Sequence, residues 1–521
     1  MQRKSPSKKN SSELDLNILS YLKSTTSKAS EIVPQTSRTY NLQSLKIDLN
    51  RIKQLIAQNT QTRSSILADA TNQDLIHSHA SADKISDSDY QLFQGIKDCS
   101  DLSLSLDECQ DYVQCYRYIA SDWTFKQLLS LISNHPNIYV AAQVLAQLRD
   151  LVESDISQSS SSDKLAVKRS QLTQCFVSCN LPQLLSNFLQ RKDRENDDSV
   201  ITCLTVLVDL CNYPDSLYEI LVACDKLNDQ VYQMCKVSSA SQVTLVNQYA
   251  MEYLNVLLTD SRNTKGFPSH DLVDQLLVSL SKFLKVQLSS ITPEGREYVE
   301  NTILLLSFLV STSDQCNSQF IADEGIELML MMVSSEDSRW HTKTGFKILD
   351  SACTKTEIAS ILVEKGILKP VFQSINYRKL PQKSTSLNIY LLDIIGRLFK
   401  YLPFDSDDRL RLLNKFMNKN YKNFNKLMKY KKIVDTADDL DETLMVACSA
   451  LINTIIAWIS IDDIVPVEKV MNIFTDSGLT ISSNLIEPLH DTYQILLGET
   501  GTENDDTEVL KDLYQALSSR Y

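Results

Sequence analysis

Two segments of the chain share one pattern: Phe320-Ile-Ala-Asp-Glu-Gly-Ile-Glu-Leu-Met329 and Ile361-Leu-Val-Glu-Lys-Gly-Ile-Leu-Lys-Pro370. In each, an apolar run ends in charged residues, one glycine follows, and a second apolar run begins. The two glycines, Gly325 and Gly366, lie 41 residues apart. A sharp turn between two helices places one residue at positive φ, which glycine adopts at little cost. We therefore predict a helix–turn–helix unit at both positions.

A spacing near 40 residues is typical of armadillo and HEAT units, in which two or three helices form one stacking element. Long helical periodicities, with only 10 glycines and 12 prolines among 521 residues, also favour an all-α protein. We predict an armadillo-type α-solenoid, a right-handed superhelix of stacked helical repeats. Solenoids of this kind usually bind partners rather than catalyse reactions.

One long inner helix is expected in each repeat. The first, at 138–150, carries small alanines among larger apolar residues, which lets neighbouring repeats approach closely. Similar helices are expected at about 200–212, 245–258, 299–311, 343–353, 387–400 and 445–459. Seven such helices imply six or seven repeats with atypical ends.

The first part of the chain has a different composition. Residues 1–87 are rich in Ser, Thr, Lys and Asp, which predicts a mostly disordered tail before a repeat domain at 88–521. A short helix is expected near 41–58, where apolar residues follow 3-4-3-4 spacing. These residues are Leu42, Leu45, Leu49, Ile52 and Ile56. We favour a helix that caps the first repeat over a coiled coil.

Charge and cysteine content limit the classes of partner and compartment. The formal net charge of −13 disfavours general affinity for nucleic acid and suits a basic partner. Several of the 12 cysteines lie in apolar helical stretches, as expected of free thiols in a reduced, intracellular protein. The N-terminus lacks the apolar core of a secretory signal. The apolar segments look too short to span a bilayer, so no membrane partner is expected.

The sequence indicates neither catalysis nor a cofactor. It holds no phosphate-binding glycine loop, no nucleophile elbow and no H-E-x-x-H zinc motif. His77 and His79 lie in the predicted tail. Cys175 and Cys179 share a helix face without a second pair of ligands, so two thiols in a repeat core are favoured over a zinc site. We expect no enzyme activity, no metal and no cofactor.

A basic run between Lys400 and Lys432 is interleaved with aromatic residues. Such a run could contact RNA through phosphates and base stacking. The favoured alternative is an amphipathic helix pair whose rings face the core and whose lysines face water. The cations within the run are Arg409, Arg411, Lys415, Lys419, Lys422, Lys426, Lys429 and Lys431, and the rings are Phe416, Tyr421, Phe424 and Tyr430.

Four carboxylates recur along the predicted inner helices. Asp209, Glu252, Glu300 and Asp350 are separated by about 43 to 50 residues. In a solenoid, such a series could line one groove with negative charge and bind an extended Lys/Arg peptide. Taken individually, each is better interpreted as a residue of a solvated helix face or as a structural hydrogen bonder, and the signal lies only in the series. We interpret the series as a candidate partner-binding surface.

Several segments together resemble the beta-catenin-like protein 1 family. They are Phe320–Met332, Thr344–Ala352 and Arg409-Leu-Arg-Leu-Leu-Asn-Lys-Phe416 continuing to Lys426-Leu-Met428. The last of these is similar to the family signature R-x-R-L-L-N-K-F…R-L-M. Ser88–Phe93 and the region from His135 to Leu151 are looser matches at the first repeat.

The resemblance implies a nuclear armadillo-fold scaffold of the nineteen complex, which activates the spliceosome in pre-mRNA splicing. It further implies dimerisation, binding of Lys/Arg-rich nuclear-localisation segments of splicing factors, and no enzyme activity. A short basic cluster of Arg3, Lys4, Lys8 and Lys9 is a weak candidate import signal.

Two alternative functions are direct RNA binding through 400–432 and nuclear import as an armadillo-class adaptor. Such adaptors carry Trp and Asn four residues apart along the groove. Here the residues four positions after Trp123, Trp340 and Trp458 are Gln, Thr and Asp. The adaptor pattern is therefore absent from the sequence, and the splicing scaffold is favoured.

Overall fold

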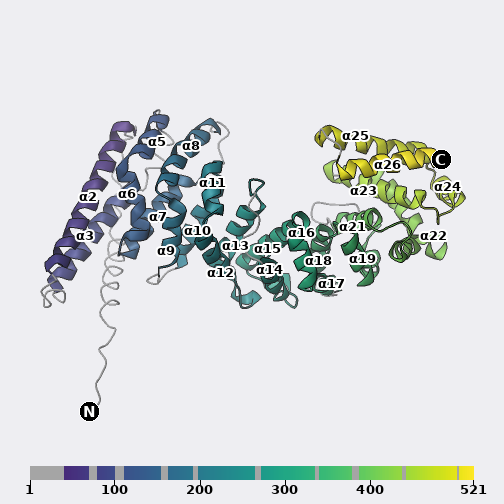
Figure 1. The fold of residues 1–521 in the computed structure, drawn as a ribbon, viewed down its shortest axis with the longest axis horizontal. Helices are drawn as coiled ribbons and strands as arrows, with labels where there is room; N and C mark the ends of the chain where they lie inside the picture. Colours follow the sequence, from purple (N-terminus) through teal and green to yellow (C-terminus); the bar gives the residue numbers. More distant parts are fainter. Residues whose placement is uncertain are drawn as a thin grey trace, which may run out of the picture. The chain divides into compact units, whose positions relative to one another are not determined.

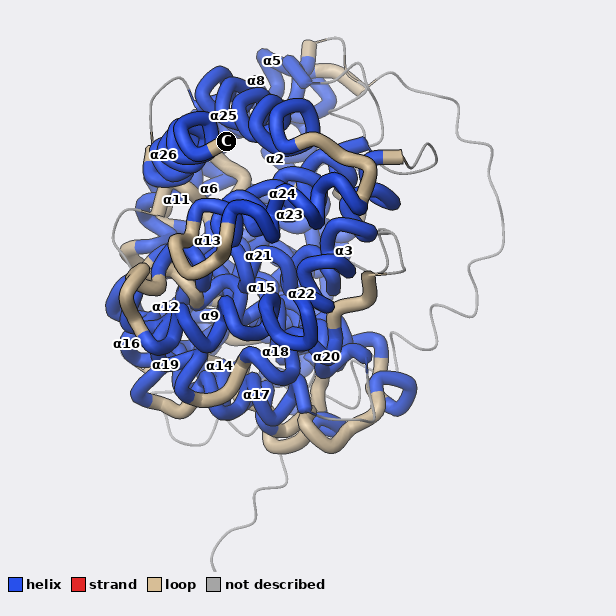
Figure 2. The backbone as a smooth tube through the Cα atoms, turned by 90° about the vertical axis from the view of Figure 1, so that its right-hand side faces the viewer, coloured by secondary structure: helices blue, strands red, loops and turns tan. Residues whose placement is uncertain are grey.

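The computed structural model describes residues 40–69, 79–99, 109, 111–153, 162–191, 197–263, 271–334, 339–377, 387–436, 442–500 and 504–521. Over these ranges the chain forms helices and loops and no strand (Figure 1, Figure 2). The chain divides into two compact units: unit 1 is Met1–Cys235 with Glu252–Gly266, and unit 2 is Lys236–Met251 with Phe267–Tyr521.

Unit 1 is helical over most of its described residues. Its helices are α2 (Leu42–Asp69), α3 (His79–Lys97), α5 (Tyr112–Ser121), α6 (Trp123–Asn134), α7 (Ile138–Val152), α8 (Ser162–Ser178), α9 (Leu181–Leu189), α10 (Asp197–Cys211), α11 (Asp215–Val222) and α12 (Asp225–Met234). Helix α13 (Leu245–Thr259) begins in unit 2 and ends in unit 1.

Unit 2 is also built from helices over its described residues. After the 3₁₀ turn η1 (Ala240–Gln242) come α14 (Leu272–Ser281), η2 (Leu288–Ser290), α15 (Pro293–Thr312), α16 (Asp314–Ala322), α17 (Gly325–Ser334), α18 (Arg339–Ala352), α19 (Thr356–Glu364), α20 (Leu368–Ser374), α21 (Leu387–Tyr401), α22 (Asp407–Asp435), α23 (Glu442–Ile461), α24 (Val467–Asp476), the π-helical turn η3 (Ser482–Ile486), α25 (Glu487–Thr500) and α26 (Asp505–Arg520).

The predicted inner helices are all present, as α7, α10, α13, α15, α18, α21 and α23. In unit 1, α7 packs between α3 and α10. In unit 2, α15 packs against α18, α18 against α21, and α21 against α23. Long helices from successive repeats thus bury their apolar sides on one another, which is the packing of an armadillo-type α-solenoid. The predicted fold class is confirmed.

Helix α2 packs on the first repeat. Leu45, Leu49 and Ile52 are almost fully buried, Ile56 is buried and Leu42 is half-buried. The helix contacts α3, α5 and α6, which agrees with the capping interpretation. It is longer than the helix expected near 41–58, and α3 extends across the boundary expected at residue 87. Residues 1–39 of the predicted tail lie outside the described ranges.

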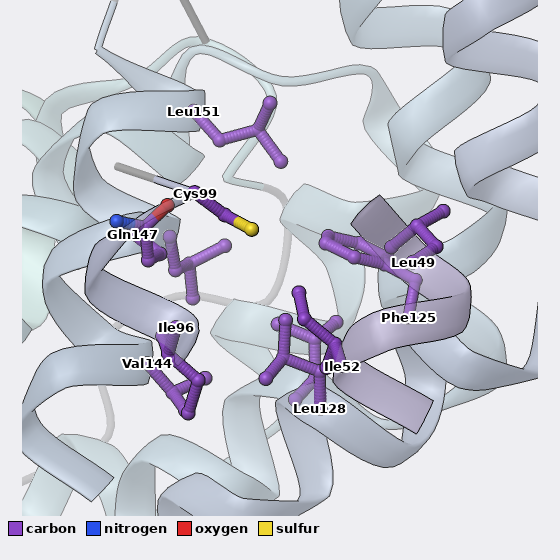
Figure 3. Close-up of a pocket in the computed structure, with 11 residues that line it drawn as sticks. Leu49, Ile52, Ile96, Cys99, Phe125, Leu128, Val144, Gln147 and Leu151 are labelled. Carbon is purple, nitrogen blue, oxygen red and sulfur yellow. The ribbon is translucent and has the colours of Figure 1, made fainter. Parts of the chain in front are cut away.

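The core beneath α2 is tightly packed. A cavity of only about 20 Å³ remains among the side chains of α2, α3, α6 and α7, room for about one water molecule (Figure 3). Gln147 is the one amide among otherwise apolar and thiol side chains there. Nearby, Asn59 of α2 donates to Asp89 of α3 at 2.8 Å and meets His135 Nε2 at 3.2 Å. These buried polar contacts give α2 a defined register on the repeat.

Helix α23 contradicts the expectation that the apolar segments are all too short to span a bilayer. Its window Leu444–Ile461 carries no charged residue and is, by length and composition alone, long and apolar enough to cross a membrane. In the structure the helix packs against α21, α22, α25 and α26, and Ile452, Ile455 and Ile459 are fully buried. Its apolarity is therefore accounted for by its place as the core helix of the last repeat.

The two turn glycines act differently. Gly366 has φ +91°, as predicted, and a Cβ added there would meet no atom within 4 Å. The prediction is wrong for Gly325, which does not have positive φ; the left-handed residue is instead its neighbour Glu324, at φ 59°. A side chain at Gly325 would place Cβ 2.6 Å from the carbonyl oxygen of Phe320. Gly325 is therefore needed for close backbone approach.

We predict that Gly366→Ala lowers stability by about 1–3 kcal/mol, because the added methyl group meets open space and the cost comes from φ alone. The matched control is Gly498→Ala, where Cβ also meets nothing but the residue lies within helix α25. That control should leave stability unchanged or raise it by about 0.5–1 kcal/mol. Calorimetric melting of both variants checks this. Equal melting temperatures would contradict the left-handed turn.

Candidate functional site

Two of the four candidate carboxylates lie close together in unit 1. Asp209 is on α10 and Glu252 is on α13, and Glu153 follows the end of α7. Burial raises the pKa of the Asp209 carboxyl to about 6; Glu153 and Glu252 raise it, and Arg169 lowers it. The three carboxylates thus lie close enough to repel one another, and the buried Asp209 Oδ2 atom lacks a hydrogen-bond donor among the described residues.

Arg169 of α8 is the cation that faces this cluster. Its guanidinium carbon lies 5.8 Å from the ring centroid of Tyr213, which orients it by a cation–π contact. One arginine among three carboxylates leaves an excess of negative charge. Sequence reasoning missed Glu153 and Arg169 because both lie outside the regular spacing that linked Asp209 to Glu252.

The other two candidates lie in unit 2 and differ from each other. Glu300 of α15 is exposed, and it raises the pKa of Lys347 on α18, which burial and Lys343 lower. Asp350 is buried, and its Oδ1 lies 3.4 Å from Arg397 Nε on α21. The structure therefore places cations beside both carboxylates, and the net negative charge here is smaller than in unit 1.

Asp350 belongs to a three-residue cluster that joins α18 to α21. Arg397 Nε also donates to Asp393 Oδ2 at 3.0 Å. Burial raises the pKa of Asp350 well above its ordinary value, Asp393 raises it further, and Arg397 lowers it. The cluster holds neighbouring inner helices together, and it accounts for Asp350 as a structural residue.

Most of the basic run lies on α22, which is broken at Asn418–Tyr421: Asn418 is extended, and Lys419, Asn420 and Tyr421 have backbone in the left-handed region. Two of its cations are structural. Arg409 is fully buried: its Nε donates to Asp462 at 3.1 Å, and its Nη1 donates to the carbonyl oxygen of Phe399 at 2.7 Å. Burial lowers the pKa of Arg409, and Asp462 raises it. Lys431 is buried beside Asp435 at 2.8 Å.

The remaining lysines of α22 do not combine with exposed rings. Phe416, Phe424 and Tyr430 are fully buried and Tyr421 is half-buried. Lysines at 419, 422, 426 and 429 are exposed. This is the amphipathic arrangement favoured from the sequence, in which rings form the core and lysines face solvent. The exposed ammonium groups could contact phosphates, but the run provides no exposed aromatic surface on which bases could stack.

The thiols and imidazoles make no metal site within the described ranges. All 12 cysteines are free, and most are buried. Cys175 and Cys179 lie near the end of α8, and the hydrogen bond between the two thiols, together with burial, raises the pKa of Cys175. His77 lies outside the described residues. Cys175 is buried in the core, and Cys179 is half-buried.

Stacked helical repeats with long inner helices define a helical-repeat protein of the armadillo class. Comparison with known proteins narrows the class. Residues 16–446 match the family described as catenin-beta-like, Arm-motif containing, nuclear, and the chain belongs to this family. It is 26% identical over 425 residues to the beta-catenin-like protein 1 homolog of Schizosaccharomyces pombe, covering 75% of this chain and 71% of that protein.

Solved structures similar to this chain include engineered helical-repeat proteins. One engineered protein covers 82% of this chain and 96% of its own, with 14% identity and a TM-score of 0.44. A computationally designed armadillo repeat protein for modular peptide recognition covers 52% of this chain and 98% of its own, with 11% identity and a TM-score of 0.37.

We predict that Asp209→Asn stabilises the protein at about pH 8, by about 1 kcal/mol after allowance for partial exposure. The folded pKa, about 6, is above the ordinary 3.8, so the charged carboxylate costs stability above pH 6. That cost fades as pH falls through 6 and is absent below about pH 4. Melting curves at both ends of this range check the prediction, with the exposed Asp229→Asn as control. A pH-independent gain would contradict it.

Proposed function

We propose that this protein is a non-enzymatic nuclear scaffold in pre-mRNA splicing that holds Lys/Arg-rich segments of partner proteins on its inner helices. The observation that carries the proposal is the cluster of Glu153, Asp209 and Glu252, near which Arg169 lies. A guanidinium or ammonium group from a partner beside the exposed Glu153 would offset the repulsion among the three carboxylates. Burial is the larger reason for the raised pKa of Asp209, and the partner's charge would lower the part of the shift that comes from Glu153 and Glu252.

The arrangement of the helices supports binding of an extended segment. Asp209 and Glu252 come from two long helices, α10 and α13, whose spacing follows the repeat. A segment that crosses successive inner helices meets one charged position on each, so charge spacing contributes to selectivity. Folded partners with compact surfaces fit such a surface less well than extended ones.

The nuclear and splicing parts of the proposal rest on the family. The family description includes the word nuclear, and the fission-yeast relative is named as a beta-catenin-like protein 1 homolog. The Arg409–Phe416 signature that suggested this family contains the buried Arg409, so at least one signature residue has a structural reason to be there. Membership of the nineteen complex is the specific assembly that we propose.

The structure gives the two alternative functions, RNA binding and nuclear import, less support than the scaffold. Three of the four rings in the basic run are buried, so direct RNA binding by stacking lacks its aromatic partners there. Trp340 lies on α18 and Trp458 on α23, each without an asparagine four residues later, so the import-adaptor pattern remains absent.

We predict that Asp209→Lys combined with Glu252→Lys weakens binding of a labelled Lys/Arg-rich peptide about tenfold or more at low salt. The difference from wild type should shrink as salt rises, because exposed charges are screened over roughly 8–10 Å. Fluorescence anisotropy at two salt concentrations measures both effects. The control is Glu219→Lys with Asp229→Lys, which makes the same charge change at exposed positions of α11 and α12. Equal weakening by both double variants would indicate bulk charge rather than a site.

We predict that splicing factors with basic segments co-purify with the tagged wild-type chain from nuclear extract. The Asp209→Lys, Glu252→Lys variant should lose them, and the Glu219→Lys, Asp229→Lys control should retain them. Mass spectrometry of the purified material makes the measurement. Recovery of transport factors in place of splicing factors would favour the import-adaptor alternative, and recovery of neither would reject the scaffold.

A further inference from the structure

The second half of α22 carries lysines along its exposed side. Lys422, Lys426 and Lys429 follow one another at intervals of four and three residues, so the helix places them on one face. Lys432 lies one turn further on, and all four side chains are exposed. The opposite face packs into the core through residues such as Phe424. These four lysines form the lysine row.

The charge around the lysine row is unbalanced. The stretch 409–434 holds nine Lys and Arg and no Asp or Glu, in a chain with 65 acidic residues and a net charge of −13. Carboxylates pair with three of these nine cations, namely Arg409, Arg411 and Lys431. Among the described residues, no carboxylate forms an ion pair with the lysine row. Like charges on adjacent turns repel one another, so an anionic partner would stabilise this face.

A break in α22 precedes the lysine row. Asn418 is extended, and the three residues 419–421 have positive φ. Left-handed backbone is costly for residues other than glycine and persists only where other contacts hold it. One such contact crosses the break: Asn423 Nδ2 donates to the carbonyl oxygen of Lys415 at 2.8 Å. The segment 422–435 is therefore a helical piece of its own, whose start is fixed without a partner.

An apolar side chain continues the face of the lysine row. Ile433 lies one turn beyond Lys429 and is 37% exposed, whereas the neighbouring Val434 is buried. At 1.5 Å per residue, the face from Lys422 to Ile433 is about 16 Å long. It thus presents three cations at helical spacing and then an isoleucine. A second helix with carboxylates at the same spacing and an apolar residue at one end would be complementary to it.

Two features favour an acidic protein segment over RNA as the partner of this face. Phe424 and Tyr430 are buried, so bases find no ring beside the lysine row on which to stack. The row is also short, and it would meet only a few phosphates while the rest of the RNA lay over a chain of net charge −13. An acidic helix carries its charge only where the lysines are, and it can supply the apolar contact.

We propose that the face from Lys422 to Ile433 binds an acidic helical segment of a partner protein. Glu or Asp side chains of that segment would accept from the lysine row, and an apolar side chain one turn further along would pack on Ile433. This partner is opposite in charge to the basic segments of the proposed function, and its site lies within unit 2. The inference therefore goes beyond the proposed function and does not depend on it.

The test uses the full chain and a labelled helical peptide with glutamates at the same spacing and one leucine a turn beyond the last glutamate. Fluorescence anisotropy measures its affinity. The triple variant Lys422→Glu, Lys426→Glu, Lys429→Glu should weaken binding about tenfold or more at low salt. Arginine at the same three positions keeps the charge and should retain binding. A peptide with glutamine in place of glutamate should not bind.

Two controls separate a site from bulk charge. The variant Lys226→Glu, Lys285→Glu, Lys469→Glu makes the same charge change at exposed positions outside α22 and should weaken binding much less. Ile433→Gln changes no charge, and it should weaken binding several-fold even at high salt, whereas Ile464→Gln, at a 48% exposed position, should not. Equal weakening by both triple variants, or unchanged affinity of Ile433→Gln, would overturn the proposal.

A labelled single-stranded uridine oligonucleotide provides the comparison with RNA. It should bind the wild-type chain more weakly than the glutamate peptide does. Tighter binding of the oligonucleotide, lost in the Lys422→Glu, Lys426→Glu, Lys429→Glu variant, would overturn the protein segment in favour of RNA. Failure of the glutamate peptide to bind the wild-type chain would also reject the proposal. The proposed function would stand in that case, because its own test uses a Lys/Arg-rich peptide and the carboxylates of unit 1.

Discussion

Each long inner helix of this protein can bury its apolar surface only against the helices of neighbouring repeats. Helix α18 illustrates the constraint: Phe346, Ile348 and Leu349 are fully buried because α15, α17 and α21 surround the helix. A single repeat would leave these side chains in water, at a cost of roughly 1.5–3 kcal/mol each. The stability of every repeat therefore depends on the next one, and both ends of the stack need a cover.

The two ends meet this need by different means. At the N-terminal end, α2 places a seam of leucines and isoleucines on the first repeat and adds buried polar contacts from Asn59. At the C-terminal end, α26 packs on α23 and is attached by Arg520. Lys400 of α21 pairs with Asp506 in the first turn of α26, and a space of about 380 Å³ remains between α21, α23, α25 and α26.

The buried charged side chains differ in whether the fold pairs them with a group of opposite charge. Arg409 with Asp462, and Arg397 with Asp350 and Asp393, are paired inside the fold, where an unpaired charge would be strongly destabilising. Burial raises the pKa of the Asp209 carboxyl, Glu153 and Glu252 raise it further, and Arg169 lowers it. Charges that the fold pairs hold helices together.

The period near 40 residues, the left-handed turn at Gly366, the seven inner helices and the capping seam could all be predicted from the sequence, because each depends on local backbone preference or on helical periodicity. The same local pattern on 444–461 could not distinguish a membrane helix from a core helix, since only the packing of α21, α22 and α26 decides that. Gly325 was assigned the right place but the wrong reason, because its close contact with Phe320 is a matter of distance rather than of φ. The carboxylate series showed regular spacing, but which members are paired depends on Arg397, Lys347 and Arg169, which come from other helices. Electrostatic energy falls with distance in space and not along the chain, so the tertiary structure alone separates Asp350 from Asp209.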